Sequence, residues 1–316
     1  VIIGSCCVYG FHGQRSFAVF RWFDSFHRFH CAAVEKTLQV FHNRHPGRGI
    51  QWDRIFRGKE DRFREGQLRI MTAGILGSIH SPADVHALSS QQLRDLCLEI
   101  RSTLLNYGRK HGGHIGSNLG VVELTVALHR VFGSPRDRFV FDVSHQSYVH
   151  KMLTGRAEAY LDESRFGEVT GFTNPLESEH DSFVLGHTGT SISLACGLAK
   201  TRDMQHTAAG ASEIGNVIAI IGDGSLSSAI AFEGLNNAAE QGGNLIIVVN
   251  DNEMSIAEDF GGMYGNLARL RASNGTAELN LFKAFGLDYR YVEQGNDVDT
   301  LVAALEDLKD IDHPVV

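Results

Sequence analysis

Two features are missing from this chain of 316 residues: a long apolar run and an excess of positive charge. A helix that crosses a bilayer needs about 20 consecutive apolar residues, and no stretch of the sequence reaches that length. Proteins that bind nucleic acid carry a surplus of Lys and Arg, whereas the formal net charge here is −8. We therefore expect neither a membrane nor a nucleic acid as partner.

Cysteine is also sparse, and its spacing fits neither a disulfide framework nor a metal site. Cys97 and Cys196 fall in apolar helical segments, so we interpret them as small core residues. This usage suits a reducing compartment, and we expect a cytoplasmic protein. The five cysteines are Cys6, Cys7, Cys31, Cys97 and Cys196.

Residues 1–70 differ in composition from the rest. They hold 12 Lys or Arg against 6 Asp or Glu, a net charge of +6, which leaves −14 for the remainder. Neither helical nor strand periodicity persists there. One interpretation is a basic nucleic-acid or targeting arm, although a transit peptide should be rich in Ser. We favour a second one, in which residues 1–70 precede a natural start at Met71 and form no part of the fold.

The remaining chain is organised around a strand, a helix and a second strand. Val217–Ile221 and Leu245–Val249 are short apolar runs rich in β-branched residues, typical of buried parallel strands. Ser225–Gln241 between them has helical spacing. The fold class predicted is therefore α/β, a parallel sheet flanked by helices. In such sheets ligands bind at the carboxyl ends of the strands.

Elsewhere the same patterns predict further elements. We expect helices opening at Ser81 and over Gln91–Tyr107, Val121–Val131, Met152–Leu161, Ile192–Thr201, Leu279–Phe285 and Asp297–Leu308. We expect strands at Phe139–Val143, Phe183–Leu185, Asp288–Val292 and from His313 onward.

Polar residues follow both central strands. Mg²⁺ prefers hard oxygen ligands and often shares them with phosphate. Asp223 offers a carboxylate, Asn252 an amide oxygen and Met254 a backbone carbonyl. The glycines on either side of Asp223 would let a diphosphate approach the backbone, and the following helix would point N–H groups at it. The alternative is a tight turn and a polar loop without a ligand.

Three histidines, His114, His145 and His187, lie in Gly- or Ser-flanked loops at the ends of predicted elements. Any one of these histidines, taken alone, is explained by a structural hydrogen-bonding role. Together on one edge of a sheet they suggest function, because imidazole exchanges protons near pH 7 and its cation binds phosphate.

From about Ser81 to the end, these motifs resemble a known family. Gly-Asp-Gly at 222–224 with Asn252 after the next strand resembles the thiamine diphosphate motif of transketolase-type enzymes. AFEGLNNA and VNDNEMSI are similar to 1-deoxy-D-xylulose-5-phosphate synthases. The resemblance implies a thiamine diphosphate-binding fold over residues 71–316, with thiamine diphosphate and Mg²⁺ as cofactors.

The resemblance also implies an activity. Synthases of this family condense pyruvate with glyceraldehyde 3-phosphate and release CO₂, in isoprenoid precursor and thiamine biosynthesis. They are homodimers whose pyrimidine-binding domain supplies an essential Glu. We expect that domain in the continuing chain or a partner chain, so that this segment is the diphosphate-binding half, truncated at its C-terminal end and inactive alone.

Residue roles follow from the same resemblance. His114 would handle substrate protons, and His145 would act in catalysis and contact the cofactor. Gly186, His187 and Thr188 would lie against thiamine diphosphate, while Asp223, Gly224, Ser225, Asn252 and Met254 would form the magnesium and diphosphate site. The chain departs from the family pattern at Ser144, where Gly is usual, at Ser225, and in a short connection from Ala268 to Leu279.

Other functions stay open. A transketolase would use the same site to transfer a two-carbon ketol unit. A cofactor-binding subunit or remnant without catalysis is the non-enzyme alternative. A dinucleotide-binding module fits less well, because Gly-Asp-Gly-Ser-Leu-Ser lacks its third Gly.

Overall fold

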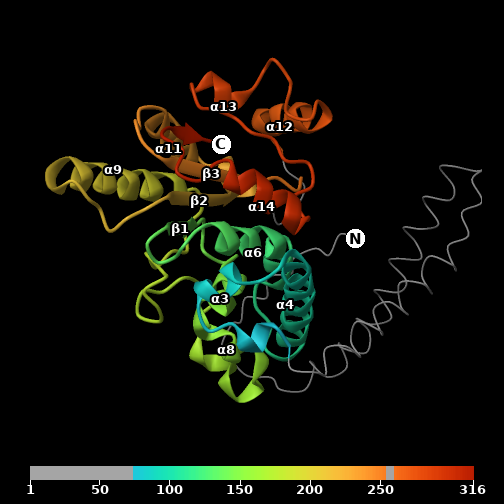
Figure 1. Cartoon of the computed structure of the whole chain (residues 1–316). Coiled ribbons are helices and arrows are strands. Elements are labelled where there is room, and N and C mark those ends of the chain that lie inside the picture. Colours follow the sequence, from blue (N-terminus) through green and yellow to red (C-terminus); the bar gives the residue numbers. More distant parts are fainter. Residues whose placement is uncertain (1–73, 254–259) are drawn as a thin grey trace, which may run out of the picture. The chain divides into compact units, whose positions relative to one another are not determined.

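The computed structural model describes residues 74–253 and 260–316. The predictions for residues 1–70 and for Met254 lie outside these ranges. Within them, one parallel sheet runs in the order β1-β2-β3-β4 (Figure 1). Its strands are β1 (Arg138–Phe141), β2 (Val217–Gly222), β3 (Leu245–Asn250) and β4 (Pro314–Val315). The predicted α/β class with a parallel sheet is confirmed.

Helices precede, connect and follow the strands. Before β1 come η1 (Leu76–Ser78), α3 (Pro82–His86), α4 (Ser90–Lys110), α5 (Ile115–Leu119) and α6 (Val122–Val131). Between β1 and β2 lie α7 (Tyr148–Lys151), η2 (Met152–Arg156), α8 (Glu158–Leu161), η3 (Glu163–Glu168) and α9 (Ser191–Ala209). The later helices are α10 (Asp223–Leu226), α11 (Ala229–Ala239), α12 (Gly262–Ala272), α13 (Leu281–Ala284) and α14 (Val298–Glu306).

Apolar side chains cover both faces of the sheet. Ile218 and Ile220 of β2 pack into a core with α4, α6 and α14. Val217, Ala219 and Ile221 point the other way, into a core with α9 and α11. The two helix layers lie on opposite sides of the strands in Figure 1. Burial on both faces explains why β2 is a continuous apolar run.

Several predicted elements differ in the structure. The helix predicted over Ser225–Gln241 is two helices, because the Ser228 side chain accepts a hydrogen bond from Ala231 N (3.2 Å) and starts α11 anew. The helix predicted over Met152–Leu161 is interrupted at Gly155, which has φ +87°. Phe183–Leu185 forms no strand, and Asp288–Val292 contributes only a single bridge from Asp288 to Val315.

The register brings three strand ends to one edge. Phe141 of β1 pairs with Ile220 of β2, and Gly222 of β2 pairs with Asn250 of β3. Residues 142–145, 223–225 and 251–253 therefore leave the sheet at neighbouring points.

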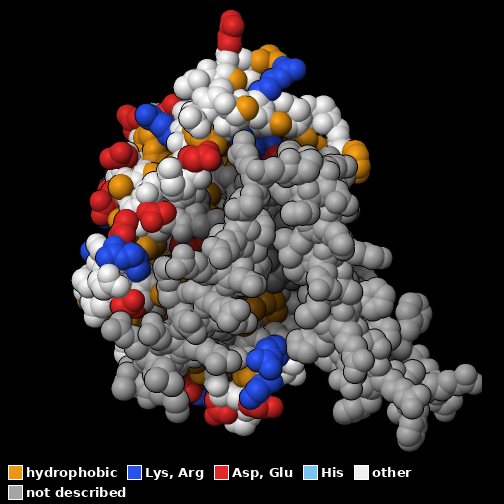
Figure 2. All heavy atoms as spheres, turned by 90° about the vertical axis from the view of Figure 1, so that its right-hand side faces the viewer, with side chains coloured by type: hydrophobic (Ala, Val, Ile, Leu, Met, Phe, Trp, Pro, Cys, Tyr) orange, Lys and Arg blue, Asp and Glu red, His pale blue; other side chains and the backbone are white. Residues whose placement is uncertain are grey.

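No described helix has the length and apolar character of a membrane span. On the face drawn in Figure 2, acidic and basic side chains of the described residues are interspersed.

Candidate functional site

Two of the predicted histidines meet at the end of β1. His114 precedes α5, and His145 follows β1 by four residues. Their ring centroids lie 5.4 Å apart in an edge-to-face arrangement. Burial lowers the pKa of His114, and burial together with the neighbouring His114 lowers the pKa of His145 to about 4. Both rings are therefore neutral at pH 7 and able to accept or donate a proton.

A fully buried amide, Asn118, joins the two histidine loops. Its Nδ2 donates to the backbone carbonyls of His114 (2.8 Å) and His145 (2.7 Å). Its Oδ1 accepts from the backbone N–H of Tyr148 (2.9 Å). The Asn118 side chain thus joins the loops of His114 and His145, which lie about thirty residues apart in the sequence, and fixes the spacing of the two histidines.

Two aromatic rings, those of Tyr148 and Phe172, pack against His114. The Tyr148 hydroxyl accepts a hydrogen bond from the backbone N–H of His114 (3.2 Å) and lies 3.4 Å from Nδ1 of the His114 ring. Phe172 packs edge-on with a centroid distance of 5.4 Å. Gly113 has φ +105°, and a Cβ there would lie 2.7 Å from the Tyr148 hydroxyl, so only glycine permits this approach. These contacts leave His114 half-buried, and this partial burial lowers its pKa.

Asp142, the first residue after β1, holds the loop that contains Gly186, His187 and Thr188. Its buried carboxylate accepts from the backbone N–H groups of Gly189 (2.8 Å) and Ser191 (2.9 Å). The three predicted cofactor-binding residues are exposed, and the ring of His187 bonds through Nδ1 to the carbonyl oxygen of Thr188 (2.8 Å). His187 therefore lies in its own loop rather than in the ring pair of His114 and His145.

Asp223 and Asn252 follow adjacent strands. Asp223 begins α10, is 3% exposed, and accepts from Gly224 N (2.9 Å) through Oδ1. Asn252 is exposed, two residues past the end of β3. Ser225 is half-buried in α10. A Cβ added at Gly222 would meet nothing within 4 Å, so the backbone there is open to a ligand.

This donor set fits magnesium and a diphosphate, because it offers one buried carboxylate, one exposed amide and free approach to the backbone. Within 74–253 and 260–316, no three His, Cys, Asp or Glu side chains converge as a metal-binding group.

Arg271 of α12 holds the segment that carries Asn252. Its guanidinium pairs with Asp251 and with Glu253 (2.6 Å for the latter), the residues on either side of Asn252. Glu253 has φ +64°, an uncommon backbone conformation that the ion pair stabilises. The position of Asn252 thus depends on a helix absent from the sequence-based prediction.

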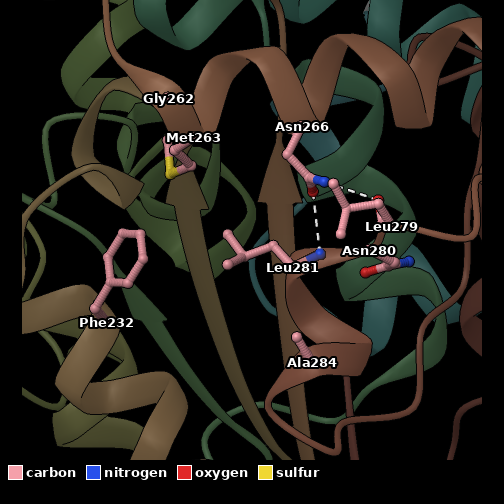
Figure 3. Close-up of a pocket in the computed structure, with 8 residues that line it drawn as sticks. All are labelled: Phe232, Gly262, Met263, Asn266, Leu279, Asn280, Leu281 and Ala284. Atoms are coloured by element: carbon pink, nitrogen blue, oxygen red, sulfur yellow. Dashed lines mark hydrogen bonds between the residues drawn. The ribbon is translucent and has the colours of Figure 1, made fainter.

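A separate apolar pocket of about 350 Å³ lies among α11, α12 and α13 (Figure 3). Phe232 and Met263 face it, and Asn266 bonds to Leu279 O (2.7 Å) and Leu281 N (3.0 Å) beside it. None of the predicted site residues lines this pocket.

Comparison with known proteins identifies the family. The family described as 1-deoxy-D-xylulose-5-phosphate synthase matches residues 76–280. The chain belongs to the 1-deoxy-D-xylulose-5-phosphate synthase family. A synthase from Pelotomaculum thermopropionicum is 50% identical over 197 residues, covering 62% of this chain and 30% of that protein. Synthase 1 of Geobacter metallireducens is 39% identical over 282 residues, covering 78% of this chain and 44% of that protein. The chain thus spans less than half the length of these relatives.

Solved structures support the fold. Transketolases from Campylobacter jejuni (TM-score 0.59) and Leishmania mexicana (TM-score 0.56) each match at 20% identity. Each match covers 72% of this chain, and 37% and 36% of the respective transketolase. At that identity the likeness concerns the fold alone, which is the transketolase-like parallel sheet predicted from sequence.

Sequence reasoning missed the residues that build the site around the synthase motifs. Asn118, Asp142 and Arg271 contact the predicted residues or their loops. Asp142 was placed inside the predicted strand Phe139–Val143, whereas β1 ends at Phe141, so that Asp142 follows its strand as Asp223 follows β2. Asn118 lies in the short helix α5, within a glycine-rich stretch of sequence where nothing marks its burial.

Proposed function

We propose that this chain is the diphosphate-binding part of a thiamine diphosphate- and Mg²⁺-dependent transferase that condenses pyruvate with glyceraldehyde 3-phosphate to 1-deoxy-D-xylulose 5-phosphate. Family membership supports the reaction type. The observation that carries the proposal is the arrangement of Asp223 and Asn252 past paired strands β2 and β3, with His114 and His145 gathered past β1.

Within this proposal, Asp223, Asn252 and the carbonyl of Met254 hold Mg²⁺. Gly224 and Ser225, at the start of α10, would contact the diphosphate. Gly186, His187 and Thr188 lie against the cofactor, and His145 contacts it. When bound, thiamine diphosphate supplies the electron sink for decarboxylation and carbon–carbon bond formation.

His114 exchanges the substrate proton. Its ring is neutral at pH 7, and its Nδ1 faces the Tyr148 hydroxyl, which leaves Nε2 for the substrate. Phe172 and Tyr148 pack against the same ring. The acid that contacts the aminopyrimidine would come from a pyrimidine-binding domain in a continuing or partner chain of a cytoplasmic homodimer.

The test is calorimetric titration of the 316-residue chain with thiamine diphosphate and Mg²⁺. Asp223→Asn should weaken binding at least about tenfold, which is about 1.4 kcal/mol, because a neutral amide attracts the cation less. Asp307→Asn, which changes an exposed carboxylate at the end of α14, should leave the affinity unchanged. Equal affinities for Asp223→Asn and the unaltered chain would refute the site.

Turnover distinguishes the reaction. We expect no steady-state release of CO₂ from pyruvate by this chain alone. Turnover when a pyrimidine-binding domain is supplied should require pyruvate. Activity with a ketose phosphate donor instead would favour the transketolase reaction.

A further inference from the structure

The segment Thr170–Asp181 connects η3 to the loop before α9 and lies against the histidine pair. It contains neither helix nor strand. Two turns, closed by Glu177 N to Asn174 O and Asp181 N to Ser178 O, and a set of side-chain contacts determine its conformation. Phe172 packs on His114 at 5.4 Å between centroids. The backbone N–H of the buried Thr173 donates to Ser144 Oγ (3.1 Å), one residue before His145. The placement of both rings therefore depends on what holds this segment.

Lys151 of α7 holds Thr170, the first residue of the segment. The side chain is fully buried, and Nζ donates to Glu177 Oε2 (2.6 Å) and to Thr170 O (2.8 Å). Glu177 Oε1 accepts in turn from the backbone N–H (2.8 Å) and hydroxyl (2.6 Å) of Thr170. Burial lowers the pKa of Lys151, while the bond to Glu177 opposes this shift. A buried ammonium is tolerated only with such fixed partners.

Arg156 of η2 holds the other end. Its guanidinium bonds to both oxygens of the buried Asp181, at 2.8 and 2.9 Å. His150 Nε2 lies 3.1 Å from the same carboxylate, which also accepts from Asn174 N (2.8 Å). Burial raises the pKa of Asp181, but the bonds from Arg156 and His150 outweigh it and keep the pKa below its usual value.

Between these ends the segment touches His114 closely. A Cβ added at Gly171 would lie 3.3 Å from the Tyr148 hydroxyl and 3.8 Å from His114 Nδ1. Movement of the segment by one or two ångströms would therefore admit water to the ring. The anchoring ion pairs join Lys151 and Arg156 to Glu177 and Asp181 of the segment.

We propose that Lys151 and Arg156 are positioning residues, which hold the segment Thr170–Asp181 through Glu177 and Asp181 so that Phe172 fixes and shields His114. The inference rests on the proposed function only in treating His114 as a reacting group. It assigns the buried Lys151 and the partly buried Arg156 an indirect part in the chemistry, through the placement of His114.

The experiment follows the ring of His114 by NMR titration in the 316-residue chain, without cofactor, with the resonance assigned through His114→Gln. Lys151→Met and Glu177→Gln should each raise the pKa of His114 toward its ordinary 6.5, because loss of the buried pair loosens the segment and hydrates the ring. Phe172→Ala should give the same rise without touching an ion pair.

Lys110→Met is the matched control. It removes an exposed ion pair with Glu163 (2.6 Å), just before the segment, and should leave the pKa of His114 unchanged. If Lys151→Met fails to fold, Glu177→Gln and Phe172→Ala decide. An unaltered His114 pKa in folded Glu177→Gln or in Phe172→Ala would overturn the proposal. The titration needs no thiamine diphosphate, so failure of cofactor binding in calorimetry would reject the proposed function and leave this result standing.

Discussion

Removing the amide of Asn118 should loosen both histidine loops at once. Asn118→Ala deletes the hydrogen bonds to the carbonyls of His114 and His145 and to the N–H of Tyr148. The carbonyl of His114 keeps a second donor, the backbone N–H of residue 118 at 3.2 Å. The loss therefore falls mainly on His145 and Tyr148. With each net hydrogen bond contributing about 0.5–1.5 kcal/mol and a buried unsatisfied group costing about 1–3 kcal/mol, we expect a loss of about 2–4 kcal/mol.

Thermal and urea unfolding, followed by circular dichroism, measure this loss. For a domain of this size the expected fall in Tm is about 5–15 °C. The matched control is Asn237→Ala, because Asn237 is exposed on α11 and bonds within its own helix to Glu233. Its effect should stay within about 0.5 kcal/mol. If Asn118→Ala were as mild as Asn237→Ala, the buried amide could not be what fixes the loops.

Three further changes follow from the same edge of the sheet. Gly189→Ala should lower the free energy of unfolding in urea by about 2–3 kcal/mol, because Gly189 has φ +80° and its added Cβ would lie 1.7 Å from the Ser228 hydroxyl, which caps α11. Adding Ser228→Gly to this variant should recover part of the loss. If the effects of the two substitutions were fully additive, the contact would be contradicted. Ser144→Gly should change Tm by less than about 4 °C, because glycine relieves the φ of +65° and this offsets the lost hydrogen bonds. It should nevertheless speed hydrogen exchange at the amide of residue 173, which donates to Ser144 Oγ. Unchanged exchange would exclude that hydrogen bond. Because the folded pKa values of His145 and His180 are about 4, against 6.5 unfolded, stability should fall as pH drops from 7 to 5, by about 1–2 kcal/mol for His145. The slope of the urea midpoint against pH should flatten in His145→Gln, and an unaltered slope would contradict the shift.

The sheet could be predicted from sequence because its strands are buried on both faces. Val217–Ile221 and Leu245–Val249 appear as apolar runs, and each proved to be the body of a strand. Phe183–Leu185 has the same apolar character but forms no strand, since its backbone serves the loop contacts instead, as when Phe183 O accepts from the Thr173 hydroxyl (2.7 Å). A three-residue run does not distinguish these outcomes.

The candidate site was predictable where a polar side chain closely follows the end of a predicted strand. Asp223 follows β2 directly and Asn252 follows β3, so strand prediction alone placed them on one edge. The pairing of His114 with His145 was not predictable in detail, because it depends on the buried amide of Asn118 in the short helix α5. Arg271 was missed for a related reason, since α12 has too weak a periodicity to appear as a helix and its ion pairs join residues far apart in sequence.

The supporting contacts explain how the three loops that carry the proposed site residues can be held in place before any ligand arrives. Asp142 ties the loop before α9 to the end of β1. Gly189 in that loop lies against Ser228, which starts α11 beyond β2, and Arg271 fixes the segment after β3. Each strand end is thus linked to a neighbouring element by hydrogen bonds, ion pairs or close packing that form on folding. Binding would then need little ordering of these loops, which favours affinity. It follows that changes at Asp142 or Arg271 should weaken cofactor binding although neither side chain is assigned a direct contact.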